Sequence, residues 1–408
     1  MSQQDAARSL LSAAAVRERA QMMLALGDKL PNFQADLARL DETAKLVIET
    51  TKAAYPSLDI PFHSRWRHFD IDGFDYWDEI DQAMAWPSPA EKARSAFDLA
   101  IVSVLLDAGA GPKWRYRYPV SGEVFTRSEG LALASLAMFR DCEFSMWPSR
   151  PLRVDASILM ELNEAKLIRG FQVSDTNPLA GVAGRADLLR RLGQTVAAAP
   201  KVFGRNDTPR PGGLFDHLAA LAQGGRIPAP TILSELLAHL GPIWPSRLTL
   251  GGISLGDCWK HPSVKTADET SGLVPLHKLS QWLAYSLIEP LQWAGIEVTD
   301  IDGLTGLAEY RNGGLFIDTG VLSLRDPAAA RREHAVDSEL VVEWRALTVA
   351  LLDRLAEIVR QRLKMDRQTL PLAKILQGGT WTAGRNIAKQ LRPDGGPPLK
   401  VISDGTVF

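Results

Sequence analysis

The sequence predicts a mainly α-helical protein with a few short strands. In most segments between turns, apolar residues recur at three- and four-residue intervals, as the buried faces of helices require. Alternation of apolar and polar residues, the pattern of a half-buried strand, is confined to short stretches. No internal sequence repeat of fixed period is present. The 408 residues, 46% hydrophobic and 23% charged, have a globular composition and suffice for one large domain or two ordinary ones.

The N-terminal part of the chain contains a series of predicted helices. Residues 5–55 contain two of them, Ala6–Leu26 and a second helix that ends at Tyr55. Ser88 and Glu91 have the spacing of a capping box, which opens a helix that runs to Ala108. A short hairpin and three more helices follow, at Trp114–Phe125 and at Ser128–Phe139, Ala156–Ile168 and Ala183–Ala198.

Residues 199–230 differ from the helices before them because they are rich in proline and glycine. A short helix is expected within them at Gly213–Ala222. We therefore expect one helical domain over residues 1–408, with an N-terminal lobe at 1–198 and a C-terminal lobe at 231–408 that carries an acidic loop. The joining segment has the composition of a linker, and whether it acts as a lid is left open.

The C-terminal part is organised around the stretch from Gly251 to Pro290. Its first half is a polar loop, and its second half is apolar at helical spacing. One interpretation is an active site, in which an acidic loop leads into a buried helix; the other is a capped core helix after a solvated loop. The other expected features are a helix at Thr231–Leu240, the longest helix at Asp337–Arg362, a helix that ends near Leu391 and a docked terminus at 406–408.

Composition and charge exclude several functional classes. A net charge of −2 gives no general attraction to nucleic acid. No apolar run approaches the roughly 20 residues that span a bilayer, and the polar start at Met1–Asp5 is unlike a signal peptide. We expect a cytoplasmic protein without a membrane or nucleic-acid partner; the oligomeric state is left open. Cys142 and Cys258 should be reduced, and a small buried thiol is favoured over a nucleophile at Cys258.

Motifs for nucleotide, metal and serine-hydrolase chemistry are missing. The sequence has no P-loop, no GxGxxG between a strand and a helix, and no GxSxG elbow. The segment Gly378–Arg385 is interpreted either as backbone amides that bind a phosphate or as a simple glycine turn. His63 and His68 are five residues apart and lack a third ligand nearby in sequence, so no metal and no cofactor are predicted.

Carboxylates among apolar and aromatic neighbours are the remaining candidates for chemistry. Burial raises the pKa of a carboxyl group and a nearby arginine lowers it, so a pair in unlike environments can supply a general acid and a base or ion stabiliser. Cleavage of the anomeric bond of a sugar requires this combination. Arg65 and Arg67, in a loop dense in histidine and aromatic residues, have the chemistry to bind phosphate. The carboxylates are Asp257, Asp268, Glu269, Glu309, Asp318 and Glu343.

Several segments resemble one family. They are FHSRWRHF (62–69), GDCWKHP (256–262), LVPLHKLSQWLAYSLIEPL (273–291), LTGLAEYRNGGLFIDTGVL (304–322), LPLAKILQGGTWTAGR (370–385) and SDGTVF (403–408). The family includes the fourth protein of the fungal and bacterial uracil-catabolism pathway, the ribosylurea route. KLSQ, EYR…GVL and VVEWRA are also similar to KRAQ, DYR…GVL and EIRA-like segments of the queuosine salvage proteins. Those proteins are nucleoside N-glycosidases with a helical, DNA-glycosylase-like (helix-hairpin-helix) architecture.

The resemblance implies a hydrolase of an N-glycosyl bond that needs no cofactor. Its substrate would be the small molecule ribosylurea or its 5′-phosphate, and its products urea and ribose or ribose phosphate. Asp257, Asp268 and Glu269 compete for the role of catalytic carboxylate, and Asp257 is favoured because it lies in GDCWKHP. The residues carried over from the matching motifs are Lys278, Gln281, Tyr310, Arg311, Glu343 and Arg345.

The implied mechanism assigns a role to each candidate. Asp257 or Asp268 would stabilise the ribosyl cation and orient water, and Glu343 or His277 would handle the proton of the leaving group. Two alternatives remain: a non-catalytic partner of the ring-opening enzyme, or an amidohydrolase for a ring-opened ureido intermediate. The expected substrate-binding residues are His63, Arg65, Arg67, His68, Trp259, Lys278, Gln281, Tyr310, Arg311, Asp318 and Arg345.

Overall fold

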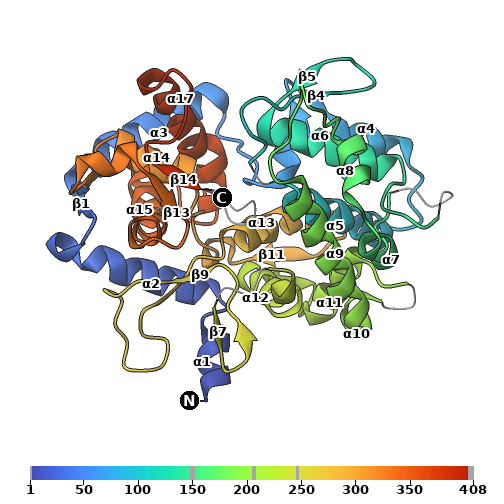
Figure 1. Cartoon of the computed structure of the whole chain (residues 1–408), viewed down its shortest axis with the longest axis horizontal. Coiled ribbons are helices and arrows are strands. Elements are labelled where there is room, and N and C mark those ends of the chain that lie inside the picture. Colours follow the sequence, from blue (N-terminus) through green and yellow to red (C-terminus); the bar gives the residue numbers. More distant parts are fainter. Residues whose placement is uncertain (1, 108, 148–151, 205–207, 245–247, 403–408) are drawn as a thin grey trace. The chain divides into compact units, whose positions relative to one another are not determined.

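A computed structural model of the chain describes residues 2–107, 109–147, 152–204, 208–244 and 248–402 (Figure 1). Helices dominate these residues, and their strands pair only in twos, which confirms the predicted mainly α fold. Contacts divide the chain into two compact units, each built from separate segments. Of the described residues, the first unit comprises those within 2–63, 248–281 and 300–402, and the second comprises those within 64–244 and 282–299.

The first unit is built around α15 (Glu339–Leu363), the long helix predicted from its apolar stripe. Most of its first half is buried, and it packs against α2, α3 and α14. The helices packed in this unit can be followed in Figure 1. They are α1 (Gln3–Ser9), α2 (Ala13–Ala25), α3 (Leu40–Ala54), α14 (Tyr310–Asp318), α16 (Leu372–Ile375), the π-helical segment η8 (Leu376–Thr380) and α17 (Trp381–Leu391).

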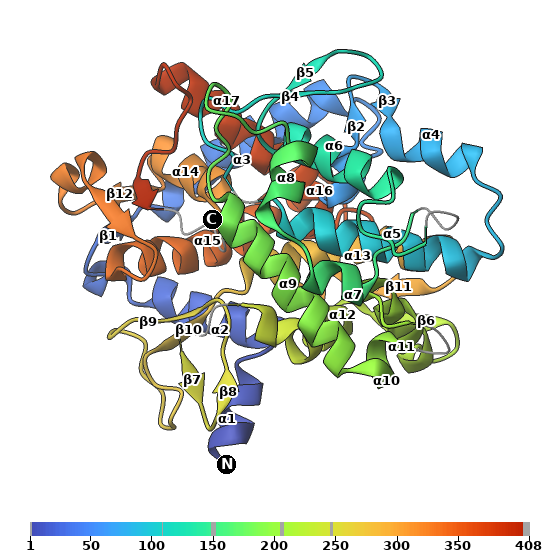
Figure 2. The ribbon, with the colours of Figure 1, turned by 45° about the vertical axis from the view of Figure 1, so that its right-hand side comes forward.

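In the described part of the first unit, four short two-stranded pairs join loops through backbone hydrogen bonds. The antiparallel pair β9–β10 contains the GDCWKHP segment and leads directly into α13. The hairpin β7–β8 lies beside α1 (Figure 2). The strand pairs are β1 (Phe33–Ala35) with β12 (Leu322–Leu324), β7 (Thr249–Leu250) with β8 (Ile253–Ser254), β9 (Cys258–Lys260) with β10 (Leu273–Pro275), and β13 (Glu333–Ala335) with β14 (Lys400–Ile402).

The second unit is a helical cluster around α5, which is buried on nearly every side from its second turn onward. Its α5 contacts α6, α9 and α11, and α7 packs closely on α9. The helices are α4 (Tyr76–Ala83), α5 (Pro89–Leu105), α6 (Arg127–Arg140), α7 (Ala156–Met160), α8 (Glu164–Gly170), α9 (Val182–Ala198), α10 (Pro200–Phe203), α11 (Leu214–Leu221) and α12 (Ala229–Leu240). The strand pairs are β2 (Asp70–Ile71) with β3 (Phe74–Asp75), β4 (Tyr116–Arg117) with β5 (Val124–Phe125), and β6 (Arg226–Pro228) with β11 (Glu297–Thr299).

Helix α13 (Lys278–Trp293) is the buried helix predicted for the organising stretch. It contributes its first turn to the first unit and its remainder to the second. Short 3₁₀ turns connect many of the other elements. They are η1 (Gly27–Lys29), η2 (Leu37–Arg39), η3 (Arg65–His68), η4 (Pro211–Gly213), η5 (Gly241–Ile243), η6 (Ile301–Gly303) and η7 (Pro327–Arg331).

Two segments predicted as single helices are each divided in two. Ala6–Leu26 forms α1 and α2, because the Ser12 side chain accepts from the amide of Ala15 and caps a new helix. Ala156–Ile168 likewise forms α7 and α8, and the Asn163 side chain caps the second. A periodic apolar pattern continues across such a cap, so these predictions of one continuous helix were wrong.

The glycine pair at Gly378–Gly379 forms neither a turn nor the start of a helix, so both interpretations of this segment were wrong. These residues lie within η8, between α16 and α17, and are buried against α3. A Cβ atom on Gly379 would lie 2.5 Å from a methyl carbon of Val47. The glycines are therefore required by close packing. The expected docking of residues 406–408 falls outside the described residues.

The proline- and glycine-rich segment is bound to α5 through buried charges. Arg210 donates to Asp98 at 2.8 Å and to Glu91 at 2.6 Å, and the amide of Gly212 donates to Asp98 at 2.6 Å. Ser88 caps α5 as predicted, since its hydroxyl accepts from the amide of Glu91. The Glu91 carboxylate, however, binds arginines, because these cations attract it more strongly than a helix-end amide does.

Candidate functional site

The β9–β10 pair brings Asp257 to the first turn of α13. The carbonyl oxygen of Asp257 accepts from the amides of Leu276 and His277, at 2.9 and 3.1 Å. Its carboxylate accepts from the amide of Lys278 at 2.9 Å. A carboxylate at a helix N-terminus compensates unpaired amides and the positive end of the helix dipole. The polar loop and the buried helix are thus joined at this aspartate.

The Asp257 carboxylate also forms a buried ion pair with Arg345. Both terminal nitrogens of Arg345 lie 2.8 Å from its oxygens, and the indole nitrogen of Trp259 donates at 2.6 Å. Burial alone would raise the pKa of Asp257, but Arg345 and the hydrogen bonds hold the pKa far below its usual range. This carboxylate is therefore ionised at neutral pH and cannot donate a proton.

Arg345 connects Asp257 to a second carboxylate segment. Its Nε donates to the carbonyl oxygen of Ala308 at 3.2 Å, and Ala308 precedes Glu309. Glu309 caps α14, because its two oxygens accept from the amides of Arg311 and Asn312 at 2.7 and 2.6 Å. One guanidinium thus holds both carboxylate segments in place.

The pKa of Glu309 is shifted in the opposite direction to that of Asp257. Its side chain is buried, and this burial raises its pKa although the two amides and the cations of Lys278 and Arg311 oppose the shift. A carboxyl group with a raised pKa can exchange a proton nearer to neutral pH, as acid–base catalysis requires. The structure therefore holds two carboxyl groups of unlike character: Asp257, which is ionised and bonds the Lys278 amide, and Glu309, which is more readily protonated and is affected by the Lys278 charge.

His63 is a third titratable group whose pKa responds to Lys278. Burial lowers the pKa of His63 to about 4, and the positive charge of Lys278 adds to this effect. Its Nδ1 lies 2.9 Å from the side-chain oxygen of Gln377, which projects from the π-helical segment η8. The imidazole is therefore neutral at pH 7. Single π-helical turns occur frequently at functional sites, which agrees with this position of Gln377.

Three predicted binding residues lie on α13 and α14. The Gln281 side chain bonds both the hydroxyl and the amide of Thr305 in the segment before Glu309. The guanidinium of Arg311 stacks over the Tyr310 ring at 4.9 Å, and its Nη1 donates to the carbonyl of Gly395. Its Nε is buried without a hydrogen-bond partner, so one donor beside Glu309 remains to be satisfied.

Glu343 and His277 are predicted proton carriers that bind the protein backbone. Glu343 is fully buried, and it accepts from the amides of Asn32 and Phe33 at 3.2 and 3.1 Å and from the Asn32 side chain at 2.7 Å. His277 has a left-handed backbone (φ 44°), and its Nε2 lies 2.9 Å from the carbonyl of Leu10. Burial lowers the pKa of His277. These contacts favour positioning roles for both residues.

Asp268 and Asp318 are two further predicted residues of the first unit. Asp268 lies in the exposed part of the polar loop and bonds the amide and hydroxyl of Thr270, which lower its pKa. Asp318 forms a bidentate ion pair with Arg392, whose two terminal nitrogens lie 2.8 and 2.5 Å from the carboxylate oxygens. Asp268 therefore orders its own loop, whereas Asp318 links α14 to the residue that follows α17.

Arg65, Arg67 and His68, the other predicted binding residues, belong to the second unit. Arg65 is 0% exposed and bonds the hydroxyl of Ser103 at 2.7 Å, with Asp107 at 3.4 Å. Arg67 pairs with Glu289 at 2.7 Å. The His68 ring meets the Trp282 ring edge-on at 5.6 Å. A phosphate could reach Arg65 only after the surrounding side chains rearranged, so its predicted role gains no support.

Glu309 and Gln377 are the residues that the sequence analysis did not select for the site. Glu309 opens the EYR segment and was considered only as one carboxylate among six. Its position in the DYR-like motif was the signal that could have selected it. Gln377 carried no signal, because its placement depends on the π-helical turn. Cys258 is fully buried, which raises the pKa of its thiol and agrees with the favoured interpretation.

None of the described helices is both long enough and apolar enough to cross a membrane.

Comparison with known proteins identified one family and two named relatives. A family model described as a protein of unknown function, DUF1688, matches residues 9–408. Protein urg3 of Schizosaccharomyces pombe is 40% identical over 98% of each chain. Uracil catabolism protein 4 of Lachancea kluyveri is 36% identical over 92% of each chain.

Proposed function

The chain belongs to the DUF1688 family, and we propose that it is an N-glycosidic hydrolase of uracil catabolism. It cleaves ribosylurea or its 5′-phosphate to urea and ribose or ribose phosphate. The proposal starts from the chain's named relatives and from the two carboxyl groups near Lys278. The observation that carries the proposal is the buried Glu309 carboxyl group, whose pKa is raised although the charges of Lys278 and Arg311 oppose the shift. A carboxyl group with a raised pKa is the usual general acid of glycosidic cleavage.

Glu309 performs the acid–base chemistry in this proposal. In its protonated form it donates a proton to the departing urea while the bond between the ribose C1′ and the urea nitrogen breaks. The resulting carboxylate stabilises the oxocarbenium-like sugar and then accepts a proton from the water that attacks C1′. The new C1′–O bond completes hydrolysis, and Glu309 regains its proton for the next cycle.

Asp257 and Arg345 act as positioning residues. Their ion pair neutralises both charges, so Asp257 contributes little charge to a sugar cation. Its hydrogen bond to the Lys278 amide and the bond from Arg345 to Ala308 instead hold the first turns of α13 and α14. Catalytic groups must be held within a fraction of an ångström to be effective. Lys278 and Arg311 supply the positive charge that lies near Glu309 and can bind a substrate oxyanion or hydroxyl.

The direct test measures urea released from ribosylurea and from its 5′-phosphate by the purified protein. Each substrate is assayed after chelator treatment and again with added zinc. Release of urea by the wild type and its loss in Glu309→Gln would support the proposal, and Glu333→Gln, at an exposed carboxylate, is the matched control. No urea from either substrate under any condition would refute the glycosidase.

The same experiment separates the two alternatives. An amidohydrolase would release ammonia or a carbamate from a ring-opened ureido compound without freeing the anomeric carbon. Assay of the reducing sugar therefore distinguishes it from a glycosidase. A non-catalytic partner would turn over neither compound and would instead associate with the ring-opening enzyme of the pathway in sedimentation experiments.

A further inference from the structure

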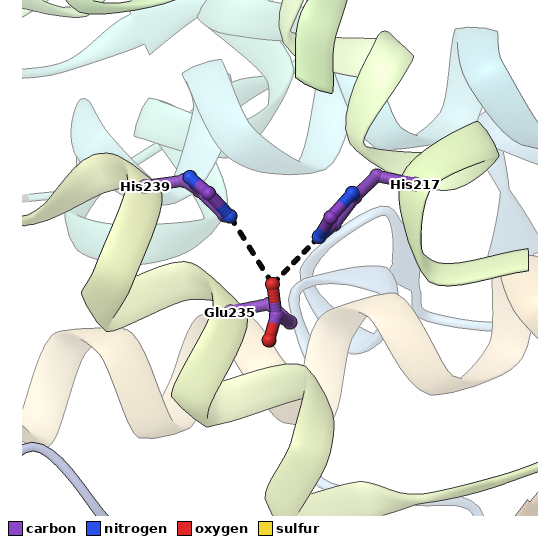
Figure 3. A group of neighbouring side chains, drawn as sticks. All are labelled: His217, Glu235 and His239. Atoms are coloured by element: carbon purple, nitrogen blue, oxygen red, sulfur yellow. Dashed lines mark hydrogen bonds and ion pairs between the residues drawn. The ribbon is translucent and has the colours of Figure 1, made fainter. Parts of the chain in front are cut away.

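Two helices of the second unit bring two histidines and a glutamate together (Figure 3). His217 lies on α11, while Glu235 and His239 lie on α12. The Nε2 atoms of His217 and His239 are 2.6 and 3.2 Å from the same carboxylate oxygen of Glu235. Among the described residues, this is the group of histidine, cysteine and acidic side chains with the spacing of a metal site.

The helical geometry explains why these ligand atoms converge. Glu235 and His239 are four residues apart and therefore lie on one face of α12. The two imidazole rings are nearly perpendicular, with centroids 5.0 Å apart, and both Nε2 atoms point toward the same oxygen of Glu235 in Figure 3. The neighbour of His217, Asp216, binds Arg94 through two 2.8 Å bonds, which holds α11 in place.

The distances fit the coordination of a small divalent cation. Zinc binds histidine nitrogen and carboxylate oxygen at about 2.0–2.2 Å, which places the ligand atoms of a tetrahedral site about 3.3 Å apart. The ligand atoms offered by the three residues all lie within 4.8 Å of one another, so small side-chain rotations bring them to this spacing. The side chains are 24–28% exposed, which leaves positions for water or another ligand.

We propose that His217, Glu235 and His239 bind a divalent transition-metal ion, with zinc as its most suitable occupant. Two imidazoles and one carboxylate without a thiolate match the preferences of zinc and similar ions. Magnesium and calcium are disfavoured because they prefer oxygen ligands. Three protein ligands with an open fourth position are typical of zinc sites that also bind water or substrate.

The competing interpretation is a hydrogen-bonded cluster, in which both imidazoles donate a proton to Glu235. The isosteric change Glu235→Gln separates the two interpretations. A glutamine oxygen still accepts hydrogen bonds, but it lacks the charge with which a carboxylate binds a metal. The variant should fold normally and lose metal affinity at least tenfold if the residues form a metal site.

The test uses the full-length protein stripped with a chelator and titrated with Co²⁺, whose visible absorption reports the number and geometry of its ligands. Zn²⁺ is then added in competition. We expect one Co²⁺ per chain, a spectrum of four- or five-coordinate metal, displacement by Zn²⁺, and weaker binding in Glu235→Gln and His239→Ala. His334→Ala is the control, because His334 is a partly exposed histidine whose Nε2 lies 2.8 Å from the backbone carbonyl of Ala329.

Three results would overturn the proposal: no Co²⁺ bound by the wild type, a spectrum of fully hydrated cobalt, or equal affinity in wild type and Glu235→Gln. If His239→Ala fails to fold, as judged by circular dichroism, Glu235→Gln and the wild-type spectrum still decide. The readout is metal binding, so it is independent of the N-glycosidase proposal, whose general acid–base residue Glu309 lies in the first unit.

Discussion

Asp257 and Glu309 are buried carboxylates of the first unit that share Lys278 as a neighbour but have opposite pKa shifts. Asp257 receives two bonds from Arg345, one from the Trp259 indole and one from a backbone amide. Glu309 accepts from two backbone amides, and Lys278 and Arg311 act on it through their charge. The comparison shows that burial and a bound guanidinium shift the pKa of a carboxyl group in opposite directions. At Asp257, the bonds from Arg345, Trp259 and the Lys278 amide outweigh burial.

The largest expected effect comes from removal of the Arg345 charge. Arg345→Met leaves Asp257 buried without a counter-ion, which typically costs about 3–5 kcal/mol. Chemical unfolding would measure this loss. In the double variant Asp257→Asn with Arg345→Met, part of the stability should return, because no unpaired charge remains. An equal loss in the single and double variants would show that packing, not charge, dominates at this position.

Glu309→Gln should lower the rate of urea release by a factor of about 100 or more, the usual contribution of a general acid–base group. Unfolding stability should fall by about 1–2 kcal/mol, because both Glu309 oxygens accept hydrogen bonds from amides of α14 and a glutamine retains only one of these acceptors. Steady-state kinetics on ribosylurea phosphate would measure the effect in kcat. Activity within twofold of the wild type would exclude Glu309 from the chemistry.

The opposite pKa shifts predict opposite pH dependences of stability, of up to about 1.4 kcal/mol per pH unit for each group. The folded pKa of Asp257 is lowered, so its contribution is present above the unfolded value of about 3.9 and is lost as pH falls toward the folded pKa. The folded pKa of Glu309 is raised, so its contribution is present below about 4.3 and is lost as pH rises through the folded pKa.

Unfolding of Asp257→Asn and Glu309→Gln, measured from pH 3 to 7, would test these signs. The stability of the wild type relative to Asp257→Asn should increase with pH at the acidic end. Relative to Glu309→Gln, it should decrease with pH. Parallel curves would mean that both carboxyl groups titrate alike, and would remove the electrostatic basis of the proposed mechanism.

The smallest expected effect is that of Trp259→Phe, which removes one hydrogen bond to Asp257 and retains an aromatic ring. A net loss of about 1 kcal/mol is typical of such a bond. Thermal unfolding would measure this loss. The comparison variant is Trp86→Phe in the second unit, which likewise removes an indole N–H bonded to a carboxylate, that of Asp81 at 2.7 Å. A much larger loss would show that Trp259 also carries packing energy.

The helices were predictable where the apolar pattern is long and uninterrupted. α3, α9 and α15 follow three- and four-residue stripes that only a buried helix face requires. The breaks at Ser12 and Asn163 were missed because a single side-chain cap outweighs the continuing pattern. The π-helical segment was missed because its glycines are selected by the packing of Val47 on a distant helix.

The site was predictable only in its residue types. Asp257, Lys278 and Arg345 were selected through short motifs, but their pairing joins residues 88 positions apart and has no local sequence signal. The same limit applies to His217, which lies 18 residues before Glu235 and on another helix. Periodicity describes which side of a helix is buried, whereas the partners of a buried charge depend on tertiary packing.

The discontinuous first unit has a consequence for synthesis of the protein on the ribosome. Its N-terminal helices α2 and α3 pack on α15, which is translated roughly 300 residues later. At about 5–20 residues per second, the nascent apolar stripes of α2 and α3 stay uncovered for roughly 15–60 seconds. Completion of this unit therefore waits for nearly the whole chain, and α2 and α3 are the segments that chaperones would be expected to shield during that interval.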